Sequence, residues 1–191
     1  MHVLEQFRYC PKCGSSHFVE ASEKSRKCEN CGFEFYLNPA AAVAAFILNS
    51  KNELLVERRK LEPAKGMLDL PGGFCDMGET VEQAMKREIK EETALDVVDM
   101  KYQFSQPNVY RFSGFDVRTL DMFFLCKVAD ETQLKFRRCR RMFLAATVGD
   151  TYRTVRTTLR TPGTPYILRR SVGLMPTEAR LAFYQISIVF Y

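Results

Sequence analysis

The chain lacks any long uninterrupted apolar run, and it lacks an export signal. A helix that crosses a membrane needs about 20 mostly apolar residues, so no membrane partner is expected. The first residues, Met-His-Val-Leu-Glu-Gln-Phe-Arg, do not show the basic and then apolar pattern of a secretory signal. We therefore expect a cytoplasmic protein. Its 191 residues, 46% of them hydrophobic, suffice for one domain with a sizeable core and one small module.

Lysine is absent after residue 135, and this absence marks an abrupt change of composition. Residues 1–135 carry a formal net charge of −3, whereas residues 136–191 carry +8, with ten arginines and two acids. A basic arm for RNA, DNA or an anionic membrane normally mixes Lys with Arg, so a nucleic-acid partner is not expected. We interpret residues 136–191 as an anomalous Arg/Thr-rich tail, translated out of frame from the end of the preceding domain. One permitted back-translation, read one base later, yields an apolar strand and an amphipathic helix. We therefore expect poor order after residue 136.

Four cysteines form two Cys-x2-Cys pairs near the start of the chain. They are Cys10, Cys13, Cys28 and Cys31. This spacing is typical of a tetrahedral zinc site with four thiolate ligands. Two disulfides are the alternative, which a reducing compartment disfavours. Because four thiolates leave no open coordination position, we expect a structural Zn²⁺ that stabilises a small module, residues 1–37.

The residues around these pairs receive simpler interpretations. Gly14 and Gly32, which follow the two pairs, suit tight turns whose backbone amides point at the sulfurs. His17 is interpreted as a loop residue, because the zinc site is already complete. The remaining cysteines are interpreted as ordinary thiols: Cys75, Cys126 and Cys139.

Three carboxylates on one predicted helix are the strongest functional signal. Glu88, Glu91 and Glu92 stand at i, i+3 and i+4, which places them together on one helical face. Thr80 and Gln83 form a capping box for that helix. A charged surface helix is the simpler alternative, but like charges crowded in this way are typical of a site for a hard divalent cation.

The segment from Gly73 to Leu95 resembles the Nudix box, G-x5-E-x7-R-E-U-x-E-E-x-G-U, where U is aliphatic. The matching residues are Gly73, Glu79, Arg87, Glu88, Ile89, Glu91, Glu92 and Leu95. Ala94 stands where the family has a glycine that ends the helix. A left-handed cap costs alanine about 1 kcal/mol.

The resemblance implies an α/β fold, the Nudix α/β/α sandwich with a mixed sheet, over residues 38–135. It implies that Glu88, Glu91 and Glu92, with the backbone carbonyl of Gly72 or Gly73, hold Mg²⁺ or Mn²⁺. Arg87 is expected to fix the carboxylates, with Glu79 as its partner. Glu88 is the candidate general base, although a later loop is an alternative source.

Apolar runs predict the strands of this domain. They cover residues 40–48, 53–57, 67–70, 97–104 and 119–128, with a turn at 113–116. Pro71-Gly72-Gly73 is expected to form a turn before the helix.

A zinc ribbon joined to a Nudix domain resembles the bacterial NADH pyrophosphatases, which carry an S-Q-P-W-P-F-P-x-S motif. Here Ser105-Gln106-Pro107 and Ser113 match, and the residues between them do not. We expect Ser105 and Gln106 to contact substrate, Tyr110 to stack on a base and Arg111 to meet phosphate. A loop that merely resembles the motif is the alternative.

The implied function is metal-dependent hydrolysis of the pyrophosphate bond in a nucleoside diphosphate linked to another moiety, such as an NADH-like dinucleotide or ADP-ribose. The partner is then a small nucleotide, and a homodimer is allowed for. A non-catalytic nucleotide-sugar sensor and an inactive product of a frameshifted gene are the two alternatives.

Overall fold

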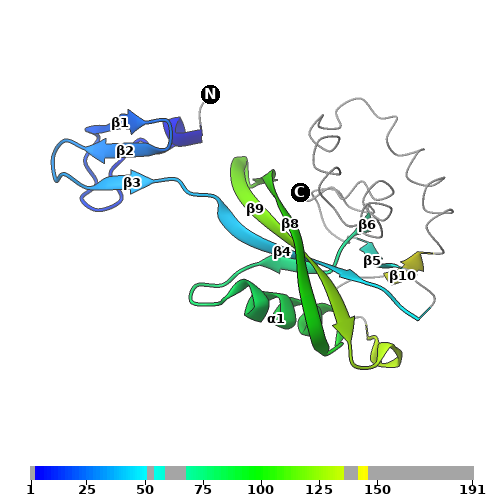
Figure 1. Cartoon of the computed structure of the whole chain (residues 1–191). Helices are drawn as coiled ribbons and strands as arrows, with labels where there is room; N and C mark the ends of the chain where they lie inside the picture. Colours follow the sequence, from blue (N-terminus) through cyan, green and yellow to red (C-terminus); the bar gives the residue numbers. More distant parts are fainter. Residues whose placement is uncertain (1–2, 51–53, 59–67, 136–141, 146–191) are drawn as a thin grey trace.

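The computed structural model describes residues 3–50, 54–58, 68–135 and 142–145 (Figure 1). A small three-stranded sheet at the N-terminus joins a larger α/β body. Within these described ranges, no helix is both long and apolar enough to cross a bilayer.

The N-terminal module is an antiparallel sheet with a short helical turn beside it. Its elements are η1 (Val3–Gln6), β1 (Phe18–Ser22), β2 (Ser25–Cys28) and β3 (Glu34–Tyr36). Cys10, Phe18 and Cys28 are buried together at its centre. The Arg26 guanidinium lies over the Phe18 ring and donates hydrogen bonds to the carbonyl oxygens of Phe18 and Leu4. Such a small core leaves much of the module's stability to the cysteine site.

The larger body is built on a four-stranded mixed sheet in the order β7-β4-β9-β8. Its strands are β4 (Ala40–Ile47), β7 (Gly72–Phe74), β8 (Val97–Phe112) and β9 (Phe115–Val128). The β4–β9 pair is parallel, and the others are antiparallel. A second sheet has the order β10-β5-β6, with β5 at Leu54–Arg58, β6 at Leu68–Asp69 and β10 at Met142–Ala145. A short turn, η2 (Glu131–Gln133), follows β9. The predicted mixed sheet is confirmed.

Helix α1 (Val81–Thr93) packs on one face of the four-stranded sheet (Figure 1). Its N-terminus carries the predicted capping box, because Thr80 and Gln83 bond to each other's backbone N–H groups. The buried stripe of Ala84, Met85 and Ile89 meets Val43 and Phe124 of the sheet. The opposite face of the sheet holds an aromatic stack, in which the Phe104 and Phe123 ring centroids lie 4.5 Å apart.

Three local predictions from the sequence were wrong. β8 and β9 run on to Phe112 and Phe115, so Ser105-Gln106-Pro107 lies in a strand and not in a loop. Ser113 and Gly114 both have positive φ, which allows a two-residue turn and leaves Phe115 and Asp116 free to pair. Pro71-Gly72-Gly73 does not simply turn, because Gly72–Phe74 forms β7.

The prediction of poor order after residue 136 falls almost wholly outside the described residues. The exception is the backbone of Met142–Ala145, which forms β10 and pairs antiparallel with β5. The tail therefore contributes at least one strand to the described structure.

The last turn of α1 ends at Ala94, which adopts the left-handed conformation with φ 63°. A glycine there would have no Cβ in conflict with the backbone. Ala94→Gly should therefore raise the free energy of unfolding by about 1 kcal/mol, measured by urea denaturation. Lys86→Gly, at an exposed position inside the same helix, is the control and should lower it by a similar amount. An equal loss in both variants would contradict the assigned strain.

Candidate active site

The site begins where α1 approaches β7. A Cβ on Gly73 would lie 2.6 Å from Oε1 of Glu88, closer than real atoms approach. Only glycine therefore lets the Glu88 carboxylate rest against this strand. Gly72 is equally constrained, because a Cβ there would lie 2.1 Å from the Val43 carbonyl oxygen. The approach at Gly72 packs β7 against β4, and the approach at Gly73 leaves room for the Glu88 carboxylate, which is buried at 7% exposure.

Arg87 ties the loop before α1 to the helix. Its guanidinium donates to both carboxylate oxygens of Glu79, at 2.7 and 2.9 Å, and to Glu88 Oε1 at 2.7 Å. It also donates to the carbonyl oxygen of Phe74 at 3.0 Å. These bonds hold the pKa of Glu79 at about 2. Arg87 is thus occupied by protein groups and orients Glu88.

Glu92 lies on the same side of the helix, facing β7. Its Oε2 accepts a hydrogen bond from the Gly72 N–H at 3.0 Å. Burial first, and then the nearby carboxylates of Glu57, Glu88 and Asp69, raise the pKa of Glu92 to about 8. These acids therefore lie close enough to Glu92 to disfavour its ionisation when no cation is bound.

Glu57 and Asp69 were missed by the sequence reasoning. Both are buried, at 7% and 5% exposure, and they face each other across the β5–β6 pair. The signal was present, because each is a single acid at the end of an apolar run, Leu54-Leu55-Val56 and Leu68. Together with the helical carboxylates they form an oxygen-rich set that suits a hard divalent cation.

Glu91 is more exposed than its neighbours. Its side chain is 40% accessible, and one oxygen lies 3.8 Å from Arg87 Nη1. The helix thus presents Glu88 and Glu92 toward β7, and Glu91 is partly exposed to solvent. All five box residues predicted to be catalytic, Glu79, Arg87, Glu88, Glu91 and Glu92, occur on this loop and helix, and their roles remain proposals.

The four cysteines form the second site, within the N-terminal module. All four sulfurs lie within 4.8 Å of one another, with Cys10–Cys31 at 3.7 Å and Cys13–Cys28 at 3.6 Å. Zinc–sulfur bonds of about 2.3 Å in a tetrahedron place sulfurs roughly 3.8 Å apart, whereas a disulfide needs about 2.05 Å. The residues therefore fit zinc and do not fit disulfides.

Two details of this module differ from or refine the sequence interpretation. The Gly14 and Gly32 N–H groups close the two turns by donating to the carbonyl oxygens of Cys10 and Cys28, and the following amides, of Ser15 and Phe33, bond to the sulfurs of Cys13 and Cys31. His17 lies outside the sulfur cluster, 3.8 Å from Glu29.

The scattered cysteines are not activated. Burial raises the pKa of Cys126 to about 12 and also raises that of Cys75, which makes them poor nucleophiles. Cys139 lies outside the described residues.

The predicted substrate residues lie along β8. Ser105 is exposed, while Gln106 is half-buried and points to the other face of the sheet. Tyr110 and Arg111 pair through their backbones with Val117 and Asp116, and their side chains lie outside the described part of the structure. The structure therefore places the backbones of all four on one strand, β8.

A buried polar cluster surrounds Gln106, and the sequence did not reveal it. Gln106 lies opposite Asp121, and Asn108 lies opposite Thr119, so the four side chains share one face of the β8–β9 pair. Asn108 donates to Asp121 at 2.9 Å. In the described residues, the Gln106 Oε1 and Thr119 Oγ1 atoms are buried without a hydrogen-bond partner. Unsatisfied buried acceptors are costly, so this face is suited to a polar ligand.

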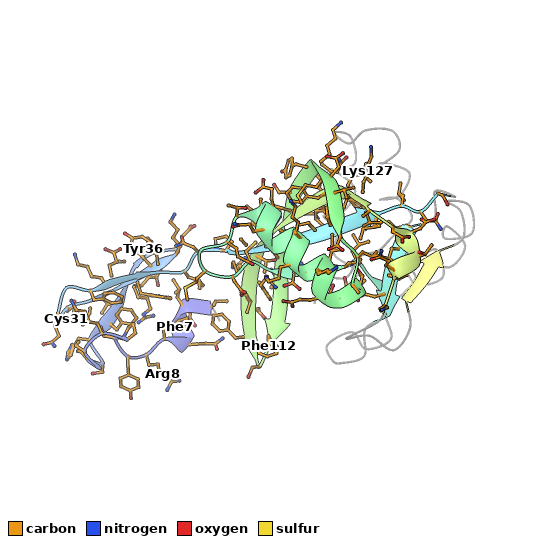
Figure 2. The ribbon with its side chains drawn as sticks, turned by 90° about the horizontal axis from the view of Figure 1, so that it is seen from below. Phe7, Arg8, Cys31, Tyr36, Phe112 and Lys127 are labelled. Atoms are coloured by element: carbon orange, nitrogen blue, oxygen red, sulfur yellow. The ribbon has the colours of Figure 1, made fainter. Side chains whose placement is uncertain are left out.

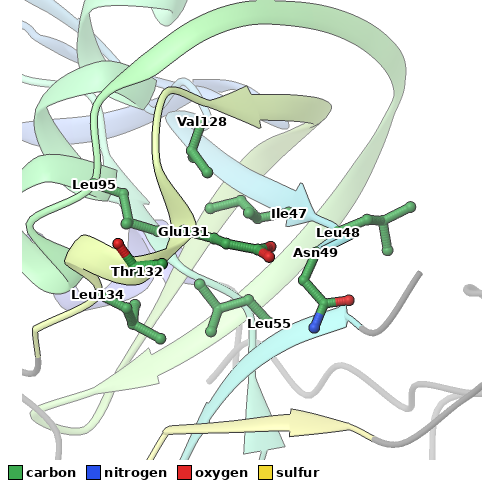
Figure 3. A pocket seen from close by; sticks show the side chains of 9 residues that line it. All are labelled: Ile47, Leu48, Asn49, Leu55, Leu95, Val128, Glu131, Thr132 and Leu134. Atoms are coloured by element: carbon green, nitrogen blue, oxygen red, sulfur yellow. The ribbon is translucent and has the colours of Figure 1, made fainter. Parts of the chain in front are cut away.

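An apolar hollow lies at the other end of the body, beyond the C-terminus of α1 (Figure 3). Leu55, Leu95 and Val128 form part of its wall, and Glu131 stands at its rim. The Glu131 carboxylate accepts hydrogen bonds from the Ser50 N–H and hydroxyl. No carboxylate of the box lines this hollow, so it is separate from the candidate active site.

Comparison with known proteins decides the family. The model of the NUDIX domain matches residues 38–148, more than half of the chain. The chain belongs to the Nudix family. The match extends beyond residue 135, into the segment where the tail was expected to begin.

The curated relatives with similar sequences include NAD-capped RNA hydrolases and an ADP-ribose pyrophosphatase. The chain is 31% identical over 106 residues to an NAD-capped RNA hydrolase NudC of Vibrio atlanticus, covering 56% of this chain and 39% of the relative. It is 52% identical over 63 residues to an ADP-ribose pyrophosphatase of Methanocaldococcus jannaschii, covering 33% of this chain and 37% of the relative. The chain thus spans about two-fifths of the length of these Nudix relatives.

Solved structures support the Nudix fold. A NUDIX hydrolase from Nitrosomonas europaea superposes with a TM-score of 0.55 at 25% identity, covering 75% of this chain and 82% of the other. A MutT NUDIX hydrolase from Burkholderia pseudomallei gives a TM-score of 0.53 at 21% identity, covering 78% and 99%. The predicted Nudix fold is therefore confirmed.

Gly73→Ala tests the close approach at the centre of the Nudix site. The new methyl group should displace the Glu88 carboxylate, and we expect any hydrolysis catalysed at this site to fall by roughly 10²-fold, as for a misplacement of about 1 Å. Steady-state kinetics measure the loss, and circular dichroism checks the fold. Gly78→Ala is the control for general backbone strain, because its φ of 88° strains any side chain while nothing lies within 4 Å of the added Cβ. Activity of Gly73→Ala equal to that of Gly78→Ala would contradict the assigned geometry.

Asp121→Asn tests the cost of the buried acid in the polar cluster. Burial raises the pKa of Asp121 in the folded protein, so folding favours its protonated form. The native acid is therefore stabilising below the unfolded pKa of about 4, and that contribution is lost as pH rises through the folded pKa. Asn cannot ionise, so the variant should have the higher Tm at pH 7 and a smaller advantage at pH 4. Thermal unfolding at both pH values measures this, and a Tm difference independent of pH would refute it.

Proposed function

We propose that the chain hydrolyses the pyrophosphate bond of a nucleoside diphosphate linked to another moiety, with Mg²⁺ or Mn²⁺ as cofactor. The observation that carries the proposal is the oxygen-rich carboxylate set around the buried Glu88 and the half-buried Glu92, in which desolvation and neighbouring acids raise the pKa of Glu92 to about 8. Relatives named as an NAD-capped RNA hydrolase and an ADP-ribose pyrophosphatase support the same substrate class.

Glu88, Glu91 and Glu92 would hold the cation, with the backbone carbonyl of Gly72 or Gly73. The cation, when bound, supplies charge neutralisation of the phosphates and acidification of a water. Glu92 must lose its proton to act as a ligand, because its pKa of about 8 leaves it largely protonated at neutral pH in the cation's absence.

The remaining residues orient the reacting groups. Arg87 holds Glu88 through Oε1, which leaves the other oxygen for a ligand or for the proton of the attacking water. Glu88 is thus the proposed general base. Glu79 fixes Arg87 and does not face the reaction itself. The proposed place for the nucleoside is the polar face around Gln106, where buried acceptors lack partners among the described residues.

Loss of one ligand tests the enzymatic assignment. Glu92→Gln removes the negative charge but keeps the shape and the bond to the Gly72 N–H. We expect hydrolysis of NADH, ADP-ribose and diadenosine polyphosphates with Mg²⁺ to fall by roughly 10²-fold or more, with no loss of folding. Glu82→Gln, an exposed change on the same helix, is the control.

The result separates three possibilities. An active wild-type chain inactivated by Glu92→Gln supports the enzyme. An inactive wild-type chain that binds ADP-ribose in calorimetry would indicate a nucleotide-sugar sensor, and a chain that does neither would indicate an inactive gene product. Comparable turnover of wild type and Glu92→Gln would overturn the proposed metal site.

A further inference from the structure

The hairpin of β8 and β9 projects beyond the sheet that supports it. β4 begins at Ala40, which pairs with Thr119, so the stretch from Val109 to Arg118 pairs only across its own two strands in the described structure. The Ser113–Gly114 turn closes it. A two-stranded hairpin without further packing is marginally stable in water. The stability of the projecting part, residues 109–118, therefore depends on the contacts made by its tip.

The N-terminal module with the four-cysteine site, hereafter the zinc module, supplies a contact at the tip of this hairpin. The Phe7 ring lies 5.7 Å from the Phe115 ring at an interplanar angle of 84°, an edge-to-face arrangement. On its other side, Phe7 lies 5.3 Å from Phe35 of β3. Figure 2 shows Phe7 on the side of the module nearest the hairpin end marked by Phe112.

Phe7 is in turn held by the zinc site. It packs against the cluster of Cys10, Phe18 and Cys28, which includes two of the four thiolates. Only residues 37–39 separate β3 from β4, so the module is also tethered to the sheet beside Thr119. Two attachments, one covalent and one aromatic, fix the module against the projecting hairpin.

We propose that the zinc module braces the β8–β9 hairpin, with Phe7 and Phe115 as positioning residues for the nucleotide-recognition face at its base. Asn108 lies on β8 opposite Thr119, the last residue of β9 that β4 supports, and Gln106 lies two residues further into the sheet. Loss of zinc or of the aromatic contact frees the tip, and the strand that carries these two residues loses its fixed register. The effect on substrate binding rests on the proposed function, whereas the brace itself does not.

Hydrogen exchange of the zinc-loaded, full-length chain tests the brace directly. Phe7→Ala should speed amide exchange across residues 109–118 about threefold to tenfold, the range expected for loss of one aromatic pair, and leave α1 unchanged. Tyr9→Ala, which removes an exposed ring from the same module, is the control. Removal of zinc with a chelator should give the same local pattern as Phe7→Ala. Unchanged exchange at 109–118, or equal acceleration in α1, would overturn the proposal.

Kinetics with NADH then separate positioning from general destabilisation. Phe115→Ala should raise KM about threefold to tenfold with little change in kcat, and Phe115→Leu should recover part of the loss. A fall in kcat at constant KM would overturn the positioning role. If the wild-type chain is inactive, the proposed function fails, while the exchange experiment still decides the brace.

Discussion

The approach of Glu88 to the backbone of Gly73 is the constraint on which the rest of the structure depends. It requires two glycines at the start of β7, a helix that begins at a fixed distance, and an apolar stripe that packs α1 onto the sheet. Arg87 completes the arrangement by joining Glu79, Phe74 and Glu88. The spacing of the box therefore reflects this geometry, because Gly73, Glu79, Arg87 and Glu88 contact one another directly.

Sequence reasoning succeeded where a local pattern has a single physical solution. The capping box at Thr80, the buried stripe of Met85 and Ile89, and the sulfur cluster of Cys10 all follow from short-range spacing. It failed where the decisive neighbour is distant in sequence. Glu57 and Asp69 matter because β5 and β6 bring them beside α1, and periodicity within either strand does not contain that information.

The β8–β9 hairpin illustrates the same limit in another form. The strand predicted from the sequence ends at residue 104, just before the Ser105-Gln106-Pro107 segment, yet these residues pair regularly with β9. Pro107 is tolerated because β8 is the edge strand of its sheet, where a missing N–H need not be donated to a further strand. These residues form a strand because β9 pairs with them and because the Ser113–Gly114 turn sets the register. The sequence of the segment alone does not contain this information.

The two candidate sites also differ in how they use charge. In the N-terminal module, a metal bound by the four thiolates would balance their charge and join the chain segments around a small core. In the carboxylate site, desolvation of Glu92 and the acids beside it raise the pKa of Glu92 to about 8, which favours a bound cation or a proton. Neighbouring carboxylates repel one another, so their side chains would turn toward solvent unless the surrounding structure held them in place. Gly73, Arg87 and the packed face of α1 supply that support. The same mixed sheet thus supports both the clustered carboxylates beside α1 and the braced β8–β9 hairpin.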